Sequence, residues 1–383
     1  MRLKVWGARV RYRILGRTGL KVSVIGFGGI KLPKVSESEA AEMLNRALDL
    51  GVNFIDTARA YGDSERKVGA ALRGRRDEFY ISSRSLSRDR DGLLKDLKVS
   101  MRELQTDYID VYELHAVNSK DLYQKVVSRG GAVEGLRIAR QKGLIGHTGI
   151  TIHYDLDVMR MAIESGEFDV IMLAYSPLDH ESVEREGILK LAKEHGMGVI
   201  VMKPLLGGQL VLPETAVGKR REDPLVRLSL KYVLSNPRVD VVIPGIKRVH
   251  EIEEDARVAD EPLPITEEEK RQLFSLIASL GLERFGYTGA MQTCLRCGYC
   301  TRVCPQGIPV PEIFRAYEVY TYYPKELRSY GVKIYESLKV KPDACIECRR
   351  CIEVCPMKLD IPARIKEIGK LFERVLRRSA RET

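Results

Sequence analysis

Residues 53–72, NFIDTARAYGDSERKVGAAL, have the pattern of one short strand followed by one helix. The run before Asp56 is apolar and of strand length, as buried parallel strands are. A turn around Gly62 separates it from a segment with helical character. The stretch therefore predicts a β-α unit with polar side chains at the carboxyl end of its strand.

The same unit recurs between Val22 and about Ala259. The other strand-like segments are VSVIGFGG (22–29), EFYISSRS (78–85), YIDVYELHA (108–116), IGHTGITI (145–152), FDVIMLAYS (168–176), GVIVMKPL (198–205) and VDVVIPGI (239–246). Eight β-α units in about 240 residues describe a (β/α)8 TIM barrel. An open doubly wound sheet shows the same alternation, but the count of eight and the absence of GxGxxG after the first strand favour closure.

The chain of 383 residues is longer than one hydrophobic core usually organises, so two domains are expected. We predict the barrel over residues 1–285 and a smaller domain over residues 286–383, with a turn-rich connector at RFGYTG.

Charge and hydropathy exclude several classes of protein. Lysine and arginine exceed aspartate and glutamate by 63 to 53, but the basic residues are dispersed among acids, which argues against nucleic-acid binding. No segment has the length of a membrane span, and the first residues lack the pattern of a secretory signal. We therefore expect a cytoplasmic protein that binds neither nucleic acid nor membrane.

Polar side chains lie at the carboxyl ends of three neighbouring predicted strands. In a (β/α)8 barrel the active site is formed at this end of the strands. Strand two ends at Asp56 with Tyr61 just beyond, strand three at Arg84 and strand four at His115. Strand ends are often polar for solvation alone, so the pattern leaves open both a catalytic site and an ordinary polar rim.

Several ordered motifs resemble the aldo-keto reductase superfamily over nearly the whole barrel. They are YRILGRTGLKVSVIGFGG (12–29), NFIDTARAYGDSERKVGAAL (53–72), DYIDVYELHA (107–116), GVIVMKPLLGGQL (198–210) and VLSNPRVDVVIPGI (233–246). The resemblance implies NADPH or NADH bound across the barrel mouth and hydride transfer to a small aldehyde or ketone. The family's catalytic aspartate, tyrosine and histidine correspond to Asp56, Tyr61 and His115, whereas Arg84 stands where the family has lysine.

The resemblance implies Tyr61 as proton donor, His115 as a hydrogen-bond donor to the carbonyl, and Asp56 as the counter-ion of the cation. These types suit a reaction in which negative charge develops on oxygen. Arg84 can lower the tyrosine pKa by its charge, but its head is planar and wider than that of lysine. The site is therefore expected to be weakened, altered in substrate or retired, and an Asp56–Arg84 ion pair that only closes the barrel mouth is the alternative.

The resemblance also implies residues for the dinucleotide. Thr151, Ile152 and Met172 stand where many relatives hold the nicotinamide amide with serine, asparagine and glutamine, and only Thr151 keeps a hydrogen-bonding group. Gly207 and Gly208 would allow close approach of a pyrophosphate, although turn formation explains glycines equally well.

Lys247 and Arg248 are candidates for the adenosine 2′-phosphate, with an ordinary exposed basic pair as the alternative. Glu251 stands where many NADPH-binding relatives are basic, which leaves the choice between NADPH and NADH open.

All eight cysteines lie in two runs, CLRCGYCTRVCP (294–305) and CIECRRCIEVCP (345–356). Each reads CxxCxxCxxxCP and resembles the two-cluster bacterial ferredoxins, in which each [4Fe–4S] cluster takes its fourth thiolate from the other run. The resemblance implies one cluster on Cys294, Cys297, Cys300 and Cys355 and a second on Cys345, Cys348, Cys351 and Cys304. Disulfides are less consistent with the reducing cytoplasm expected for this chain. Zinc sites are less consistent with four cysteines in the spacing CxxCxxCxxxCP. The linker between the runs favours a mainly α-helical dicluster ferredoxin-like domain.

Three functions follow from this combination. The first is an iron-sulfur aldo-keto reductase-like enzyme that reduces small carbonyl compounds with NAD(P)H. The second is an electron-transfer protein with a redox partner, whose barrel binds that partner or another cofactor. The third gives the clusters a purely structural role. A flavin would reconcile hydride transfer with one-electron clusters, but no sequence motif supports one.

Overall fold

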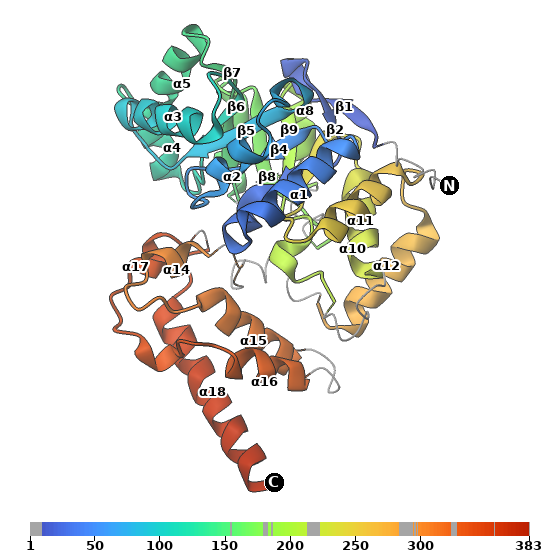
Figure 1. Ribbon diagram of the computed structural model, residues 1–383, viewed down its shortest axis with the longest axis vertical. Helices are drawn as coiled ribbons and strands as arrows, with labels where there is room; N and C mark the ends of the chain where they lie inside the picture. Colours follow the sequence, from blue (N-terminus) through green and yellow to red (C-terminus); the bar gives the residue numbers. More distant parts are fainter. Residues whose placement is uncertain are drawn as a thin grey trace. The chain divides into compact units, whose positions relative to one another are not determined.

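The computed structural model describes residues 10–153, 155–178, 183–184, 187–212, 223–282, 294, 296, 298–322, 328–355 and 357–382, with side chains as far as residue 377. They fall into two compact units, which Figure 1 shows in ribbon form. The first lies within Met1–Leu205 and Leu212–Lys270, and the second within Leu206–Val211 and Arg271–Thr383. The predicted boundary after residue 285 and its connector lie outside the described residues and stay a prediction.

The first unit is built around an eight-stranded parallel sheet whose strands pair in chain order. The strands are β3 (Phe27–Gly28), β4 (Phe54–Asp56), β5 (Tyr80–Ser85), β6 (Ile109–Leu114), β7 (Ile145–Ile152), β8 (Val170–Ala174), β9 (Gly198–Met202) and β10 (Val241–Ile243). The Gly26 N–H donates to the Val242 carbonyl over 2.8 Å and the Gly28 N–H to the Pro244 carbonyl over 3.0 Å. These bonds join the first strand to the last, so the predicted (β/α)8 barrel is confirmed and the open sheet is excluded.

The first predicted strand, residues 22–29, is wrong in extent. β2 (Lys21–Ser23) pairs antiparallel with β1 (Tyr12–Ile14), and only β3 joins the barrel. Leu15 and Val22 are fully buried among side chains of the barrel interior such as Phe54. Because the hairpin uses its apolar residues to fill the interior, the segment divides into two short strands.

Helices surround the strands. They are α1 (Glu37–Asp49), α2 (Ser64–Ala71), α3 (Arg90–Leu104), α4 (Lys120–Val127), α5 (Ala132–Gln141), α6 (Leu156–Glu164), α8 (Ile188–Glu194), α10 (Pro224–Leu234) and α11 (Val249–Asp260). The division between the two units falls within α12 (Glu267–Ser279), after Lys270. Short 3-10 turns occur at Gly16–Thr18, Gly29–Lys34, Arg76–Glu78, Leu206–Gly208 and Pro342–Ala344. A capping box at Ser36 and Glu39 begins α1, whose apolar face packs into the core against the strands.

The second unit is mainly helical, as predicted. Its helices are α14 (Tyr299–Val303), α15 (Val310–Tyr322), α16 (Arg328–Glu336), α17 (Arg350–Glu353) and α18 (Ile361–Glu382). Tyr335 of α16 stacks on Phe372 of α18 with ring centroids 4.2 Å apart. Three cysteines, Cys294, Cys300 and Cys355, belong to the same buried core. None of the helices in the described ranges combines the length and hydrophobicity that a membrane span requires.

Candidate active site and cluster sites

Four predicted side chains meet at the carboxyl ends of β4, β5 and β6. Arg84 grips Asp56 with two hydrogen bonds, from Nη1 over 2.7 Å and from Nη2 over 2.6 Å. The same Nη2 donates to the Tyr61 hydroxyl oxygen over 2.9 Å. The His115 ring stands edge-on to the Tyr61 ring, with centroids 5.8 Å apart. All four are buried, so Asp56, Arg84 and Tyr61 form one hydrogen-bonded chain with His115 beside it.

Glu113 is a fifth member of this group and was not predicted from the sequence. It is fully buried, accepts hydrogen bonds from Ser82 Oγ over 2.6 Å and Thr151 Oγ1 over 2.7 Å, and lies 3.7 Å from Arg84 Nη1. Gly149 on β7 makes room for it, since a Cβ there would lie 2.6 Å from the Glu113 Cγ. Glu113 stands two residues before His115, and alternate residues of a strand share a face, which is the signal that could have revealed it.

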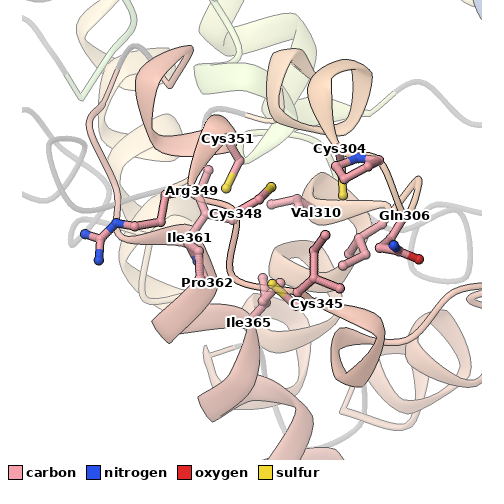
Figure 2. A pocket seen from close by; sticks show the side chains of 13 residues that line it. Cys304, Gln306, Val310, Cys345, Cys348, Arg349, Cys351, Ile361, Pro362 and Ile365 are labelled. Atoms are coloured by element: carbon pink, nitrogen blue, oxygen red, sulfur yellow. The ribbon is translucent and has the colours of Figure 1, made fainter.

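In the second unit, one cysteine of the first run lies with three of the second. Cys304, Cys345, Cys348 and Cys351 line one pocket that is partly open to solvent. Figure 2 shows the four around it, with the Arg349 guanidinium directed away. This is the set that the crossed connectivity assigns to one cluster. Their thiols and this hollow suit a cube of iron and sulfur.

The first set is more enclosed. Cys294, Cys300 and Cys355 are each less than 9% exposed and share one apolar core, while Cys297 lies outside the described residues. No disulfide joins any two of the seven described cysteines. No three metal-binding side chains in the described parts of the chain converge on a single ion.

Family comparison agrees with both parts of the chain. The model described as the aldo/keto reductase family matches residues 24–215, about half of the chain. The chain belongs to the aldo/keto reductase family. A model described as a 4Fe-4S dicluster domain matches residues 288–359. The protein is thus an oxidoreductase of the aldo/keto reductase family with a 4Fe–4S dicluster domain, as the motifs predicted.

Individual relatives resemble this aldo/keto reductase over most of their own length. L-galactose dehydrogenase of Arabidopsis thaliana is 30% identical and covers 66% of this chain and 89% of its own. The uncharacterized oxidoreductase YqkF of Bacillus subtilis is 26% identical, with coverages of 70% and 96%. Among solved structures, the holo form of aldo-keto reductase AKR11C1 from Bacillus halodurans is 28% identical, with a TM-score of 0.59 and coverages of 70% and 96%.

Burial and charge shape the electrostatics of the reductase site. Burial raises the pKa of Asp56 to about 6, although the charge of Arg84 opposes the rise. Burial also acts to lower the pKa of Arg84, but the neighbouring Asp56, Tyr61 and Glu113 outweigh it and hold that pKa well above its ordinary value. The site therefore keeps a permanent cation beside Tyr61, held between two carboxyl groups.

The predicted amide-binding positions lie against this cation. The Met172 sulfur accepts from Arg84 Nη1 over 3.0 Å, and the Thr151 hydroxyl donates to Glu113. Ile152 instead belongs to the core between strands and helices. Met172 and Thr151 thus each form a hydrogen bond to a member of the ion-pair network, Arg84 or Glu113.

A second basic group lies where β7 and β9 end. Lys203 Nζ is 3.4 Å from His153 Nδ1. Burial, and after it the charge of Lys203, hold the pKa of His153 well below its usual range, so this imidazole is neutral at physiological pH.

The remaining cofactor candidates lie in separate places. Gly207 and Gly208 adopt φ of 66° and 93°, which favour glycine, and Arg296 Nη1 donates to the Gly208 carbonyl over 3.0 Å within the second unit. Lys247 and Arg248 are exposed just before α11. The Glu251 carboxylate accepts from the backbone N–H groups of both, over 2.7 and 3.2 Å, so Glu251 caps α11.

Proposed function

We propose that the barrel reduces small aldehydes or ketones with NAD(P)H and that Tyr61 is the proton donor. The observation that carries this proposal is the Arg84 guanidinium, which bonds both carboxylate oxygens of Asp56 and the oxygen of Tyr61. A bound nicotinamide would supply hydride to the carbonyl carbon, and Thr151, Lys247 and Arg248 are the residues of the first unit proposed to hold the dinucleotide. The dehydrogenase name of the Arabidopsis relative supports a small hydroxy or carbonyl substrate.

The residues of the site perform the proton half of the reaction. As negative charge grows on the carbonyl oxygen, the Tyr61 hydroxyl gives that oxygen its proton, and the product is an alcohol. Arg84 stabilises the tyrosinate left behind, which regains a proton from solvent. His115, beside the Tyr61 ring, is proposed to orient the carbonyl. Arginine can fill the role of lysine here because the step requires a fixed positive charge and no proton from the cation.

The first test is turnover by anaerobically purified, cluster-replete protein given NADPH or NADH and a panel of small aldehydes and ketones. We expect stoichiometric conversion of carbonyl to alcohol. No conversion with either dinucleotide would reject the proposal and leave the Asp56–Arg84 pair as a structural closure of the barrel.

The reaction is expected to fail in acid. Because the pKa of Asp56 is raised to about 6, its carboxyl takes up a proton as the pH falls through that value and no longer balances Arg84. We expect kcat/KM to fall below pH about 6. In the Asp56→Asn variant this acidic decrease in kcat/KM should be absent. The folded state binds this proton more tightly than the unfolded chain, so the group stabilises the fold as the pH falls from about 6. A fold lost together with activity would contradict this explanation.

Glu113 is expected to position Arg84. Glu113→Gln keeps the size but removes the negative charge 3.7 Å from Nη1. We expect kcat to fall roughly tenfold, since one contact to a charged group contributes about 1.5 kcal/mol, with the dissociation constant for NADPH unchanged. Glu65→Gln is the control, because Glu65 is equally buried but pairs with Arg59 and Ser83. Equal losses of kcat in both variants would contradict a specific role for Glu113.

We propose that the second unit holds two [4Fe–4S] clusters, on Cys294, Cys297, Cys300 and Cys355 and on Cys345, Cys348, Cys351 and Cys304. The pocket lined by Cys304 and three cysteines of the second run supports the crossed set. Hydride carries two electrons and a cube normally accepts one, so direct exchange requires a converter such as a flavin. We therefore place the clusters outside the hydride-transfer step.

A further inference from the structure

The two proposed cluster sites differ in their access to solvent. Cys294, Cys300 and Cys355 are all buried. In the other set Cys348 is exposed, and Cys304, Cys345 and Cys351 are partly exposed. A cluster held by the second set lies at the surface of its unit, where an external molecule can approach it.

The segment that carries this exposed set also presents an apolar side chain. Ile346, between Cys345 and Glu347, is 60% exposed and lines the same pocket as the sulfurs. A single exposed isoleucine is ordinary on a protein surface. Its position against the rim of a proposed redox centre is what makes it a candidate contact.

Two exposed arginines follow Ile346 within four residues of the chain. Arg349 and Arg350 are exposed, and within the described residues neither makes an ion pair. The acid next to Ile346 in the chain, Glu347, is paired with Lys366 over 3.2 Å. Of these two arginines, Arg349 lines the pocket, and Figure 2 shows its guanidinium directed away from the cysteines. We call Ile346, Cys348, Arg349 and Arg350 the basic rim.

We propose that the basic rim docks a small acidic electron-carrier protein, which exchanges one electron with the cluster on Cys304, Cys345, Cys348 and Cys351. In the reductive direction the carrier loses one electron and the [4Fe–4S] centre gains it, with no bond made or broken. The proposal rests on the two-cluster assignment made above. An exposed apolar contact beside two exposed arginines suits a transient redox encounter with an acidic partner, in which a small buried area is combined with electrostatic steering.

The test is the rate of cluster reduction by an acidic flavodoxin, reduced beforehand and mixed anaerobically with the cluster-loaded full chain. We expect the second-order rate constant to fall as salt is added, because steering between opposite charges is screened. Reversing both charges with Arg349→Glu and Arg350→Glu should lower the constant at least about tenfold at low salt. The matched control is the pair Lys370→Glu and Arg374→Glu, two exposed basic residues of α18, which should change it less than about twofold.

The outcomes separate the two proposals. Iron content and the paramagnetic resonance spectrum establish whether the unmodified chain and both charge-reversal variants hold their clusters. Loaded clusters with a salt-independent rate, or with equal losses in both variant pairs, overturn the docking face and leave the two-cluster assignment intact. A chain that cannot hold the second cluster overturns the assignment and the docking face together.

Discussion

Tyr61→Phe is expected to lower kcat for carbonyl reduction about 10²–10⁴-fold, the range that general acids contribute. The change removes one hydroxyl oxygen, which accepts a hydrogen bond from Arg84, and leaves the ring against His115 in place. Because the lost step is proton transfer, the dissociation constant for NADPH should stay within about twofold. Steady-state kinetics and a separate fluorescence titration of dinucleotide binding measure the two effects.

Tyr123→Phe is the control for this variant. It deletes the same group from another buried tyrosine, whose hydroxyl donates to the Met161 carbonyl on α6. We expect its kcat to stay near that of the unmodified enzyme. A Tyr61→Phe variant that retains most of its kcat would show that another group supplies the proton.

Cys304→Ser is expected to remove one cluster and about half of the iron, and the lost cluster is the one shared with the second run. Pairs of substitutions test the connectivity more sharply than single ones. Cys304→Ser combined with Cys345→Ser should cost no more iron than either alone, since both side chains line one pocket. Cys304→Ser combined with Cys294→Ser should remove both clusters.

Uncrossed connectivity predicts the reverse, with the larger iron loss in the pair drawn from the two runs. Iron and labile sulfide per chain, measured after anaerobic purification, decide between them. Cys355→Ser with Cys294→Ser extends the test to the buried set and should again cost a single cluster. The measured unfolding temperature should fall in every variant that loses a cluster, because metal binding is coupled to folding.

The barrel and the chain of Asp56, Tyr61, Arg84 and His115 were predicted from sequence for a local reason. Strand length, helical periodicity and the turn residues between them are properties of short segments, and parallel strands deliver their carboxyl ends to one face. Counting eight units was therefore enough to predict closure and to bring strand-end side chains together. The spacing of the cysteines was informative for the same reason.

The first strand and Glu113 show where local pattern stops being sufficient. The hydrophobicity of residues 22–29 does not distinguish a strand of the barrel from a segment that fills the barrel interior, because both arrangements bury the apolar side chains. Leu15 and Val22 take the second course. From the sequence, Glu113 is an isolated charge within an apolar strand. The tertiary structure surrounds it with Ser82, Thr151 and Arg84.

The barrel class, the family and the presence of a 4Fe–4S dicluster domain were determined by the sequence, since each depends on residue types at short and regular spacings. Only the tertiary structure decided that Arg84 spans Asp56 and Tyr61, that the buried Glu113 lies beside Arg84, and that Cys304 lies with Cys345, Cys348 and Cys351. These contacts join residues distant in the chain, and their distances depend on how whole elements pack.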